Sequence, residues 1–146
     1  MSLEKMNIGW IGAGKMGGPM SGNVIAAGGA VTVFDPVAEN LDRVVAAGGQ
    51  AGTSNRALAA TADVVVSMIP NDAVLRAVTT GEDGIFAVMK PGSVYLDMST
   101  VSPEASAEVD AAATAAGIHY LRAPVSGSTA LAEAGTLTIM GSGPRQ

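Results

Sequence analysis

The 146-residue sequence contains no cysteine and only one histidine, His119. Without cysteine the chain forms no disulfide bond and has no thiolate to act as a nucleophile or metal ligand. A single histidine also rules out a metal site built from several histidines within this chain, and no metal site is predicted. Aromatic residues are scarce as well, at 3% with one tryptophan.

Charged residues are few, and acidic ones outnumber basic ones. The sequence has 13 Asp and Glu against 8 Lys and Arg, a net charge of −5. Nucleic-acid binding requires a basic face, so no nucleic-acid partner is expected. No apolar run approaches the ~18 residues of a membrane-spanning helix, and no signal peptide opens the sequence. We therefore expect a cytoplasmic protein with no membrane partner.

Apolar residues and glycine are abundant, at 48% and 19 residues respectively. At this length we expect one domain over residues 1–146 with a sizeable core. Short β-branched runs alternate with segments of helical period, which is typical of a parallel sheet buried on both faces. The predicted fold class is therefore α/β, with a doubly wound, Rossmann-like parallel sheet.

Glycine and proline mark the ends of most predicted elements. The predicted strands are 7–11, 30–34, 50–51, 63–69, 94–98, 118–121 and 137–140. The predicted helices are 16–27, 36–47, 54–60, one starting at 71 or 72, a short piece within 85–89, and 102–116. Ser54 and Ser102 are predicted helix N-caps, because a serine hydroxyl accepts a hydrogen bond from a free N–H of the first turn.

Three glycines with the spacing Gly-x-Gly-x-x-Gly stand between the first predicted strand and helix: Gly12, Gly14 and Gly17. The first allows a tight turn, the second lets the backbone approach a pyrophosphate, and the third lets the helix pack on the sheet. The free N–H groups and positive dipole end of the helix suit the same anion. Since glycine turns are common, the weight of this motif depends on its context.

Asp35 supplies that context. It follows the predicted strand 30–34 and lies 18 residues after Gly17, where a carboxylate accepts hydrogen bonds from the adenosine ribose. Its charge would repel the 2′-phosphate of NADP, and no arginine follows it directly, so the sequence favours NAD. Asp35 would alternatively cap the next helix, with Pro36 at the first helical position. Both roles can hold, because a carboxylate has two oxygens.

Residues that follow parallel strands share one edge of the sheet, where ligands bind. The predicted rim is made of residues 12–17, 35, 68–70, 99–100 and 123–128. Ser99 and Thr100 would hold the nicotinamide ribose or carboxamide, or they would cap the helix that follows. The sequence leaves both alternatives open.

Three motifs, in this order, resemble the β-hydroxyacid dehydrogenase family. They are residues 9–20 (Gly-Trp-Ile-Gly-Ala-Gly-Lys-Met-Gly-Gly-Pro-Met), 97–100 (Asp-Met-Ser-Thr) and 123–127 (Ala-Pro-Val-Ser-Gly). The family includes 3-hydroxyisobutyrate dehydrogenases and tartronate semialdehyde reductases, and is related to 6-phosphogluconate dehydrogenases. The resemblance implies the NAD(P)-binding domain of an oxidoreductase that transfers hydride between its cofactor and a small 3-hydroxy acid or semialdehyde.

The resemblance also implies roles for individual residues. Ser126 and Gly127 would bind and position the substrate beside the nicotinamide, and Arg122 and Ser128 flank them in the same predicted substrate site. Together, the positions at the strand ends and the resemblance give the predicted cofactor-binding residues: Gly12, Ala13, Gly14, Lys15, Met16, Gly17, Asp35, Met68, Ile69, Pro70, Val74, Ser99 and Thr100.

Two positions depart from the family pattern. Arg122 stands where the family usually has an acidic residue, and Ser128 stands where it has a second glycine. Arg122 would pair with a substrate carboxylate or point into solvent. These departures leave the identity of the substrate open.

The family carries a catalytic lysine and a nearby asparagine on a long helix after the nucleotide domain, followed by a helical domain that dimerises. This sequence reaches Gln146 before that helix would start, and neither Lys15 nor Lys90 matches the catalytic position. We therefore expect a homo-oligomeric parent enzyme and an isolated chain without activity. The alternatives are a non-catalytic NAD-binding or scaffolding module, and an NADP enzyme of the 6-phosphogluconate dehydrogenase or imine reductase type, which Asp35 opposes.

Overall fold

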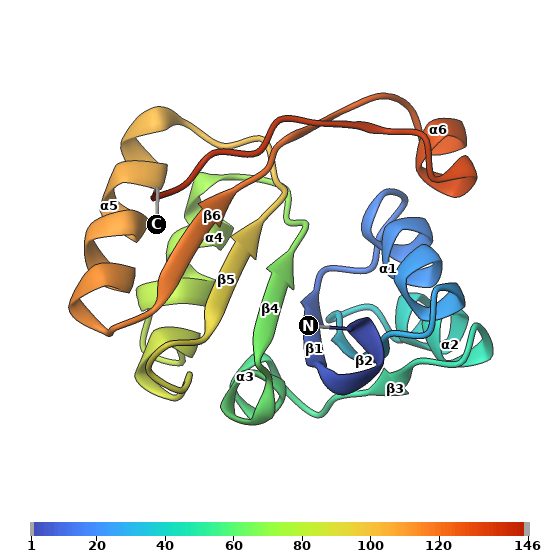
Figure 1. Ribbon diagram of the computed structural model, residues 1–146, viewed down its shortest axis with the longest axis horizontal. Coiled ribbons are helices and arrows are strands. Elements are labelled where there is room, and N and C mark those ends of the chain that lie inside the picture. The colour runs from blue at the N-terminus through green and yellow to red at the C-terminus, as the bar shows by residue number, and fades with distance from the viewer. Residues whose placement is uncertain (1, 145–146) are drawn as a thin grey trace.

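The computed structural model describes residues 2–144, and its centre is a six-stranded sheet (Figure 1). The strand order is β3-β2-β1-β4-β5-β6, and every pair of neighbours is parallel. These strands are β1 (Asn7–Ile11), β2 (Ala30–Phe34), β3 (Gln50–Ala51), β4 (Val64–Ser67), β5 (Val94–Asp97) and β6 (His119–Arg122). The predicted doubly wound α/β fold is confirmed. The outermost positions of the predicted domain, residues 1 and 145–146, lie outside the described residues.

Helices cover both faces of the sheet, and a separate apolar core lies between the sheet and the helices on each face. Leu58 of α3, Leu75 of α4 and Val109 of α5 pack on one face, whereas Met20 of α1 and Val44 of α2 pack on the other. The helices are α1 (Gly17–Ala26), α2 (Ala38–Ala46), α3 (Asn55–Thr61), α4 (Asp72–Thr80), α5 (Pro103–Ala115) and α6 (Thr129–Ala134), with short 3₁₀ turns η1 (Leu3–Lys5) and η2 (Ile85–Ala87). This two-sided burial explains why the central strands are continuous apolar runs.

Side-chain caps begin α3 and α5, as predicted, and also α4 and α6. The hydroxyl of Ser54 accepts a hydrogen bond from the backbone N–H of α3, and that of Ser102 does the same for α5. Asn71, rather than Asp72, caps α4. Asp72 Oδ1 instead accepts a 2.8 Å hydrogen bond from Ser102 N, which ties the starts of α4 and α5 together.

The start of α2 differs from the prediction. The helix begins at Ala38 after the N-cap residue Val37, so Pro36 is not its first residue and Asp35 is not its cap. The Asp35 carboxylate accepts a hydrogen bond from Val37 N two residues later, in a local turn that precedes the helix. Competition between such side-chain turns and helix caps is common for aspartate.

The C-terminal part of the chain also differs from the prediction. The predicted strand over 137–140 is the short β8 (Thr138–Ile139), which pairs antiparallel with β7 (Val125–Ser126) outside the main sheet. Neither β7 nor α6 was predicted from the sequence. Pro124 has no N–H to donate and directly precedes β7, which favours a break after β6. After β8 the chain returns along β6, where Ser142 pairs with Arg122 (Figure 1).

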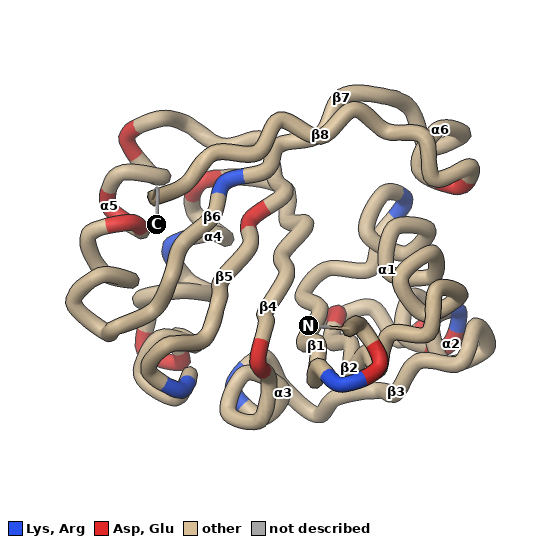
Figure 2. The backbone as a smooth tube through the Cα atoms, viewed as in Figure 1, with Lys and Arg blue, Asp and Glu red and all other residues tan. Residues whose placement is uncertain are grey.

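One face of the sheet is covered less completely than the other. Beside α1 an apolar cavity of about 390 Å³ opens over β4 and β5, and Val64, Val66 and Leu96 are among its lining residues. Ile139, which also lines it, and the adjacent Met140 are 57% and 52% exposed. Basic and acidic positions are interspersed around the backbone (Figure 2). None of the described helices is long and apolar enough to cross a membrane.

Candidate cofactor-binding site

A cavity of about 680 Å³ lies at the carboxyl ends of β1, β2 and β4. This is the edge at which parallel sheets bind ligands. The cavity brings together ten of the predicted cofactor-binding residues: Gly12, Gly14, Lys15, Met16, Gly17, Asp35, Met68, Ile69, Pro70 and Val74.

The glycine-rich turn has the geometry that a dinucleotide requires. Gly12 has a φ of +90°, and a Cβ there would overlap the carbonyl oxygen of Met68. A Cβ at Gly17 would overlap the carbonyl oxygen of Gly12, so both positions require glycine. At Gly14, by contrast, a Cβ would meet no atom within 4 Å. The backbone of Gly14 is therefore open to a ligand, and a pyrophosphate fits this space at the start of α1.

Asp35 joins the glycine-rich turn to the end of β2. It is only 8% exposed. Its Oδ2 accepts a 2.8 Å hydrogen bond from Ala13 N, and its Oδ1 accepts bonds from Val37 N at 2.8 Å and Asn40 Nδ2 at 3.1 Å. A carboxylate offers about four acceptor positions, so Asp35 can accept one more hydrogen bond. A ribose hydroxyl at this end of the cavity would donate the fourth hydrogen bond to the Asp35 carboxylate.

Buried polar groups fix the wall of the cavity that follows β4. Asp97 Oδ1 accepts hydrogen bonds from Ser67 Oγ at 2.8 Å and from Ser99 N at 3.1 Å. Ser67 Oγ also lies 2.7 Å from Tyr95 Oη, while Ser99 Oγ accepts a 2.8 Å bond from Ile69 N. This network holds the loop after β4 against the loop after β5.

Burial controls the protonation of this network. Burial raises the pKa of the Asp97 carboxyl above its usual value, and hydrogen bonds from Ser99 and Ser67 oppose that shift. Burial also raises the pKa of Tyr95 well above its usual value. The tyrosine is therefore a neutral hydroxyl at physiological pH.

Ser99 and Thr100 do not line the cavity. Ser99 is 3% exposed and its hydroxyl oxygen already accepts the bond from Ile69 N, whereas Thr100 is exposed. The cap of α5 comes from Ser102, so the structure does not use Ser99 or Thr100 as the helix cap. Ser99 instead supports the cavity wall from behind.

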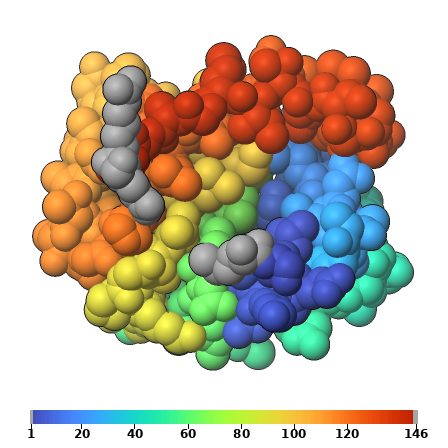
Figure 3. All heavy atoms as spheres, viewed as in Figure 1, coloured from blue at the N-terminus to red at the C-terminus, as the bar shows by residue number. Residues whose placement is uncertain are grey.

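The predicted substrate loop lies next to α1 and the glycine-rich turn. Ser126 is exposed, Gly127 has a φ of +145°, and Ser128 Oγ caps α6 by accepting a 3.4 Å bond from Leu131 N. Asn23 Nδ2 donates a 2.8 Å bond to Ala132 O and thereby fastens α6 to α1. In the space-filling view the red segment that contains α6 lies against the blue segment that contains α1 (Figure 3).

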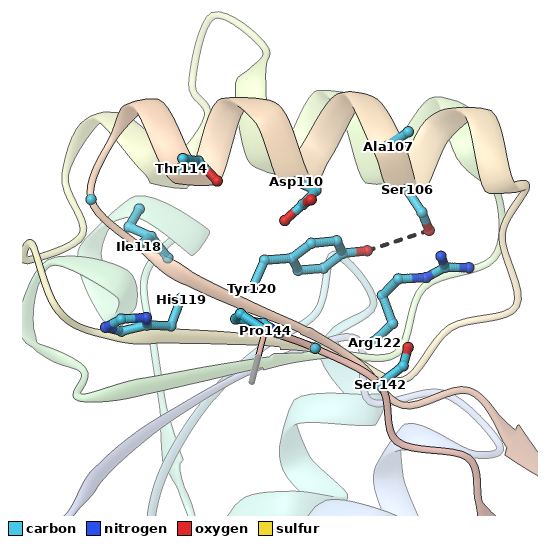
Figure 4. A pocket seen from close by; sticks show the side chains of 12 residues that line it. Ser106, Ala107, Asp110, Thr114, Ile118, His119, Tyr120, Arg122, Ser142 and Pro144 are labelled. Atoms are coloured by element: carbon cyan, nitrogen blue, oxygen red, sulfur yellow. Dashed lines mark hydrogen bonds between the residues drawn. The ribbon is translucent and has the colours of Figure 1, made fainter. Parts of the chain in front are cut away.

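Arg122 lies away from this loop. Its side chain lines a separate cavity of about 710 Å³ between α5 and residues 142–144, beside Ser106 and Tyr120 (Figure 4). Tyr120 Oη donates a 3.4 Å hydrogen bond to Ser106 Oγ there. Of the two predicted orientations, the structure shows neither a substrate-loop contact nor simple projection into solvent.

Seven residues that line the cofactor cavity were not among the predicted cofactor-binding residues: Ile11, Phe34, Pro36, Val37, Asn40, Asn55 and Val78. Val78 lies one turn after Val74 in α4, so helical spacing alone would have found it. Asn55 Oδ1 is buried and has no hydrogen-bond partner. Such an orphaned acceptor costs about 1–3 kcal/mol, and no local sequence pattern indicates it.

The part of the chain that the structure describes contains no group of three or more histidine, cysteine, aspartate or glutamate side chains placed to hold a metal ion. The cavity instead combines an open glycine backbone, a carboxylate and apolar walls. Those features fit a dinucleotide.

Comparison with known proteins agrees with this geometry. The sequence pattern of the NAD binding domain of 6-phosphogluconate dehydrogenase matches residues 7–146. The chain is 43% identical over 139 residues to 2-(hydroxymethyl)glutarate dehydrogenase of Eubacterium barkeri, an alignment that covers 94% of this chain and 46% of the relative. It is 44% identical over 133 residues to NAD-dependent L-serine dehydrogenase of Pseudomonas aeruginosa, covering 91% and 45%.

A solved structure has the same fold. Mycobacterium tuberculosis 3-hydroxyisobutyrate dehydrogenase with L-serine superimposes with a TM-score of 0.90 at 37% identity, over 95% of this chain and 47% of that one. The chain thus spans about half the length of the relatives it matches. It belongs to the family of the NAD binding domain of 6-phosphogluconate dehydrogenase, with hydroxy-acid dehydrogenases among its relatives.

Proposed function

We propose that this chain is the cofactor-binding half of an NAD-dependent dehydrogenase that acts on a small 3-hydroxy acid or its semialdehyde. The observation that carries the proposal is the cavity in which the open backbone of Gly14 and the Asp35 carboxylate face one space. When bound, NAD supplies the hydride acceptor. The glycine-rich turn would hold the pyrophosphate, and Ile69, Pro70 and Val74 would exclude water around the cofactor.

The preference for NAD over NADP rests on charge. Asp35 already accepts hydrogen bonds from three donors and has room for one hydroxyl. A 2′-phosphate in the same place would bring a second anion against this carboxylate, which is unfavourable in a partly buried site. Pro36 and Val37 follow Asp35 and provide no compensating cation.

The names of the relatives suggest the substrate class. L-Serine, 3-hydroxyisobutyrate and 2-(hydroxymethyl)glutarate each carry a hydroxymethyl group on the carbon that bears a carboxylate. Oxidation of such a group removes a hydride from the hydroxymethyl carbon and a proton from its hydroxyl, and gives an aldehyde. The exposed Ser126, with the backbone N–H groups of the loop, would bind the substrate carboxylate. We propose that Gly127 and Ser128 shape this loop. Arg122 lines a separate cavity, so we do not place it in contact with the substrate.

The proton requires a base that we place outside this chain. Lys15 lines the cofactor cavity, and Lys90 Nζ donates to Thr61 O at 3.2 Å. Lys90 Nζ also lies 4.0 Å from Asp63 Oδ1, just before β4. Lys90 is therefore at the amino ends of the strands, whereas the cofactor cavity is at their carboxyl ends. We therefore expect the chain alone to bind its cofactor without turnover. A homo-oligomeric parent and a cytoplasmic location are further proposals that rest on the family resemblance.

Binding can be tested through the single tryptophan. Trp10 is 2% exposed, and its Nε1 donates a 3.0 Å bond to Gly12 O, so it lies beside the proposed pyrophosphate site. NADH absorbs light at the wavelengths where tryptophan emits. Bound NADH should therefore quench the fluorescence of Trp10 and itself fluoresce more strongly when Trp10 is excited. We expect saturable energy transfer to NADH, and weaker transfer to NADPH.

A matched pair of alanine variants makes this test specific. A Cβ meets no atom within 4 Å at either Gly14 or Gly22, so both variants should fold. Gly14→Ala places a methyl group in the pyrophosphate space and should weaken NADH binding at least tenfold. Gly22→Ala lies within α1 and should bind as the wild type does. Equal binding by Gly14→Ala and the wild type would contradict the proposed site.

A further inference from the structure

The chain leaves the main sheet over residues 125–139, where it forms β7, α6 and β8. Two side-chain hydrogen bonds join this segment to the rest of the described chain. Asn23 Nδ2 donates to Ala132 O at 2.8 Å. Thr129 Oγ1 donates to Met16 Sδ at 4.0 Å. Asn23 lies in α1 and Met16 is the N-cap residue of α1, so both bonds connect α6 to the same helix.

The bond from Asn23 supports the last turn of α6. The last carbonyls of a helix have no partner within it, and α6 has only six residues, too few for a helix to be stable by itself. Ala132 is fully buried in the apolar core that also contains Met20 of α1. The position of α6 therefore depends on α1, beside which it lies (Figure 1).

The two helices belong to the two proposed ligand sites. α1 starts at the glycine-rich turn, and its N-cap residue Met16 lines the cofactor cavity. Ser126 and Gly127 of the proposed substrate loop come just before α6, and Ser128 is the cap of α6. A ligand at the start of α1 thus restricts a helix to which the substrate loop is fastened.

We propose that Asn23 is a positioning residue that, through α6, holds the substrate loop in place relative to the cofactor. This role rests on the proposed function, because it takes the cavity as the cofactor site and residues 126–128 as the substrate loop. Coupling between two sites needs an element that both can restrict. The Asn23 bond to Ala132 O makes α1 such an element, because it extends any restriction of α1 to α6.

Hydrogen exchange of the α6 backbone N–H groups tests this role, with ADP-ribose as the probe. ADP-ribose has the pyrophosphate and both riboses of NAD but no nicotinamide, so no ring reaches toward the substrate loop. We expect saturating ADP-ribose to slow exchange in α6 of the wild-type chain about fivefold, the effect of one net hydrogen bond. Asn23→Ala should lose this slowing and still bind ADP-ribose, because Asn23 does not line the cofactor cavity.

Ser102→Ala is the control for a general loss of stability. The Ser102 hydroxyl bonds to Ala105 N of α5 and belongs to neither α1 nor α6. Its removal should destabilise the chain and yet leave the slowing by ADP-ribose in α6 unchanged. Alanine favours a helix more than asparagine does, so α1 should remain folded in Asn23→Ala.

The outcomes separate this role from the proposed function. If the wild type binds neither NADH nor ADP-ribose, the proposed function fails, and the role of Asn23 fails with it. If the wild type binds NADH but ADP-ribose does not slow exchange in α6, only the role of Asn23 is overturned. Slowing that survives Asn23→Ala, or that is lost equally in Ser102→Ala, overturns it as well.

Discussion

Two nearly buried carboxylates have different surroundings and therefore different tasks. Asp35 faces the cofactor cavity and accepts hydrogen bonds from Ala13 N, Val37 N and Asn40 Nδ2. Asp97 is 2% exposed and accepts bonds from Ser67 Oγ and Ser99 N on one oxygen. The first carboxylate can still bind a ligand hydroxyl, whereas the second supports the wall behind Ile69.

Asp97 makes the stability of the chain depend on pH in a defined direction. Burial raises its pKa in the folded state above the unfolded value of about 3.9. The folded state thus binds this proton more tightly, and the resulting stabilisation is complete below the unfolded pKa and is lost as pH rises through the folded pKa. Asp97→Asn keeps an acceptor oxygen and does not titrate at this position.

We therefore predict that the wild-type free energy of unfolding falls relative to that of Asp97→Asn as pH rises from about 4 to 7. Urea denaturation of both proteins at several pH values measures this difference. All other carboxylates are shared, so their titration cancels if the two unfolded states are alike. A difference that does not change with pH would contradict the role of burial at Asp97.

At the scale of elements, α5 depends on its N-terminal cap. Ser102 Oγ accepts a 3.1 Å bond from Ala105 N, and α5 then buries Ala105, Val109 and Ala113 in the core. Ser102→Ala should lower the free energy of unfolding by about 1 kcal/mol, the typical effect of losing a serine cap. Chemical denaturation checks this value.

Ser128→Ala is the comparison. Its cap bond to Leu131 N is longer, at 3.4 Å, and α6 has only six residues. We expect Ser128→Ala to cost less than Ser102→Ala. If Ser128→Ala lowered the free energy of unfolding more than Ser102→Ala, the length of the cap hydrogen bond and the packing of the helix would not explain the stabilisation by these two caps.

Sequence patterns predict the main elements because each pattern is local. Apolar runs such as Val64–Ser67 specify buried strands, and Ser102 with Pro103 specifies a helix start. The antiparallel pairing of Val125–Ser126 with Thr138–Ile139 depends on a contact across the chain, and two-residue strands have too little periodicity to indicate it. The side-chain network behind Ile69 was missed for the same reason, because its members come from two segments that are about 30 residues apart in the sequence.

The sequence predicts which residues share the cavity where their position depends on strand ends, but not where it depends on tertiary packing. Residues just after parallel strands must share an edge, which placed Gly12, Asp35 and Ile69 together. Asn55 follows a helix cap rather than a long strand, and only the packed structure leaves its oxygen without a partner. Strand alternation places Arg122 on the face of Tyr120, but it does not tell which face borders the substrate loop.

At the scale of the whole molecule, the unevenly covered sheet has a physical consequence. The apolar cavity over β4 and β5 and the exposed Ile139 form a patch of the kind that promotes association. We predict that the isolated chain self-associates as its concentration rises, which light scattering or analytical ultracentrifugation would measure. Ile139→Asp should reduce this association.

Val45→Asp is the control for that prediction. Val45 is 45% exposed but belongs to α2, away from the apolar cavity. The charge added there should leave the association almost unchanged. A wild-type chain that stays monomeric at the highest concentration, or equal effects of both variants, would contradict the assignment of this patch.

The most direct test of the central claim is a calorimetric titration of the chain with NAD and, in parallel, with NADP. The cavity at the ends of β1, β2 and β4 predicts saturable binding of NAD with one site per chain, and weaker binding of NADP because of Asp35. Tighter binding of NADP would contradict the role of Asp35. Absence of binding by both dinucleotides would contradict the cofactor site itself.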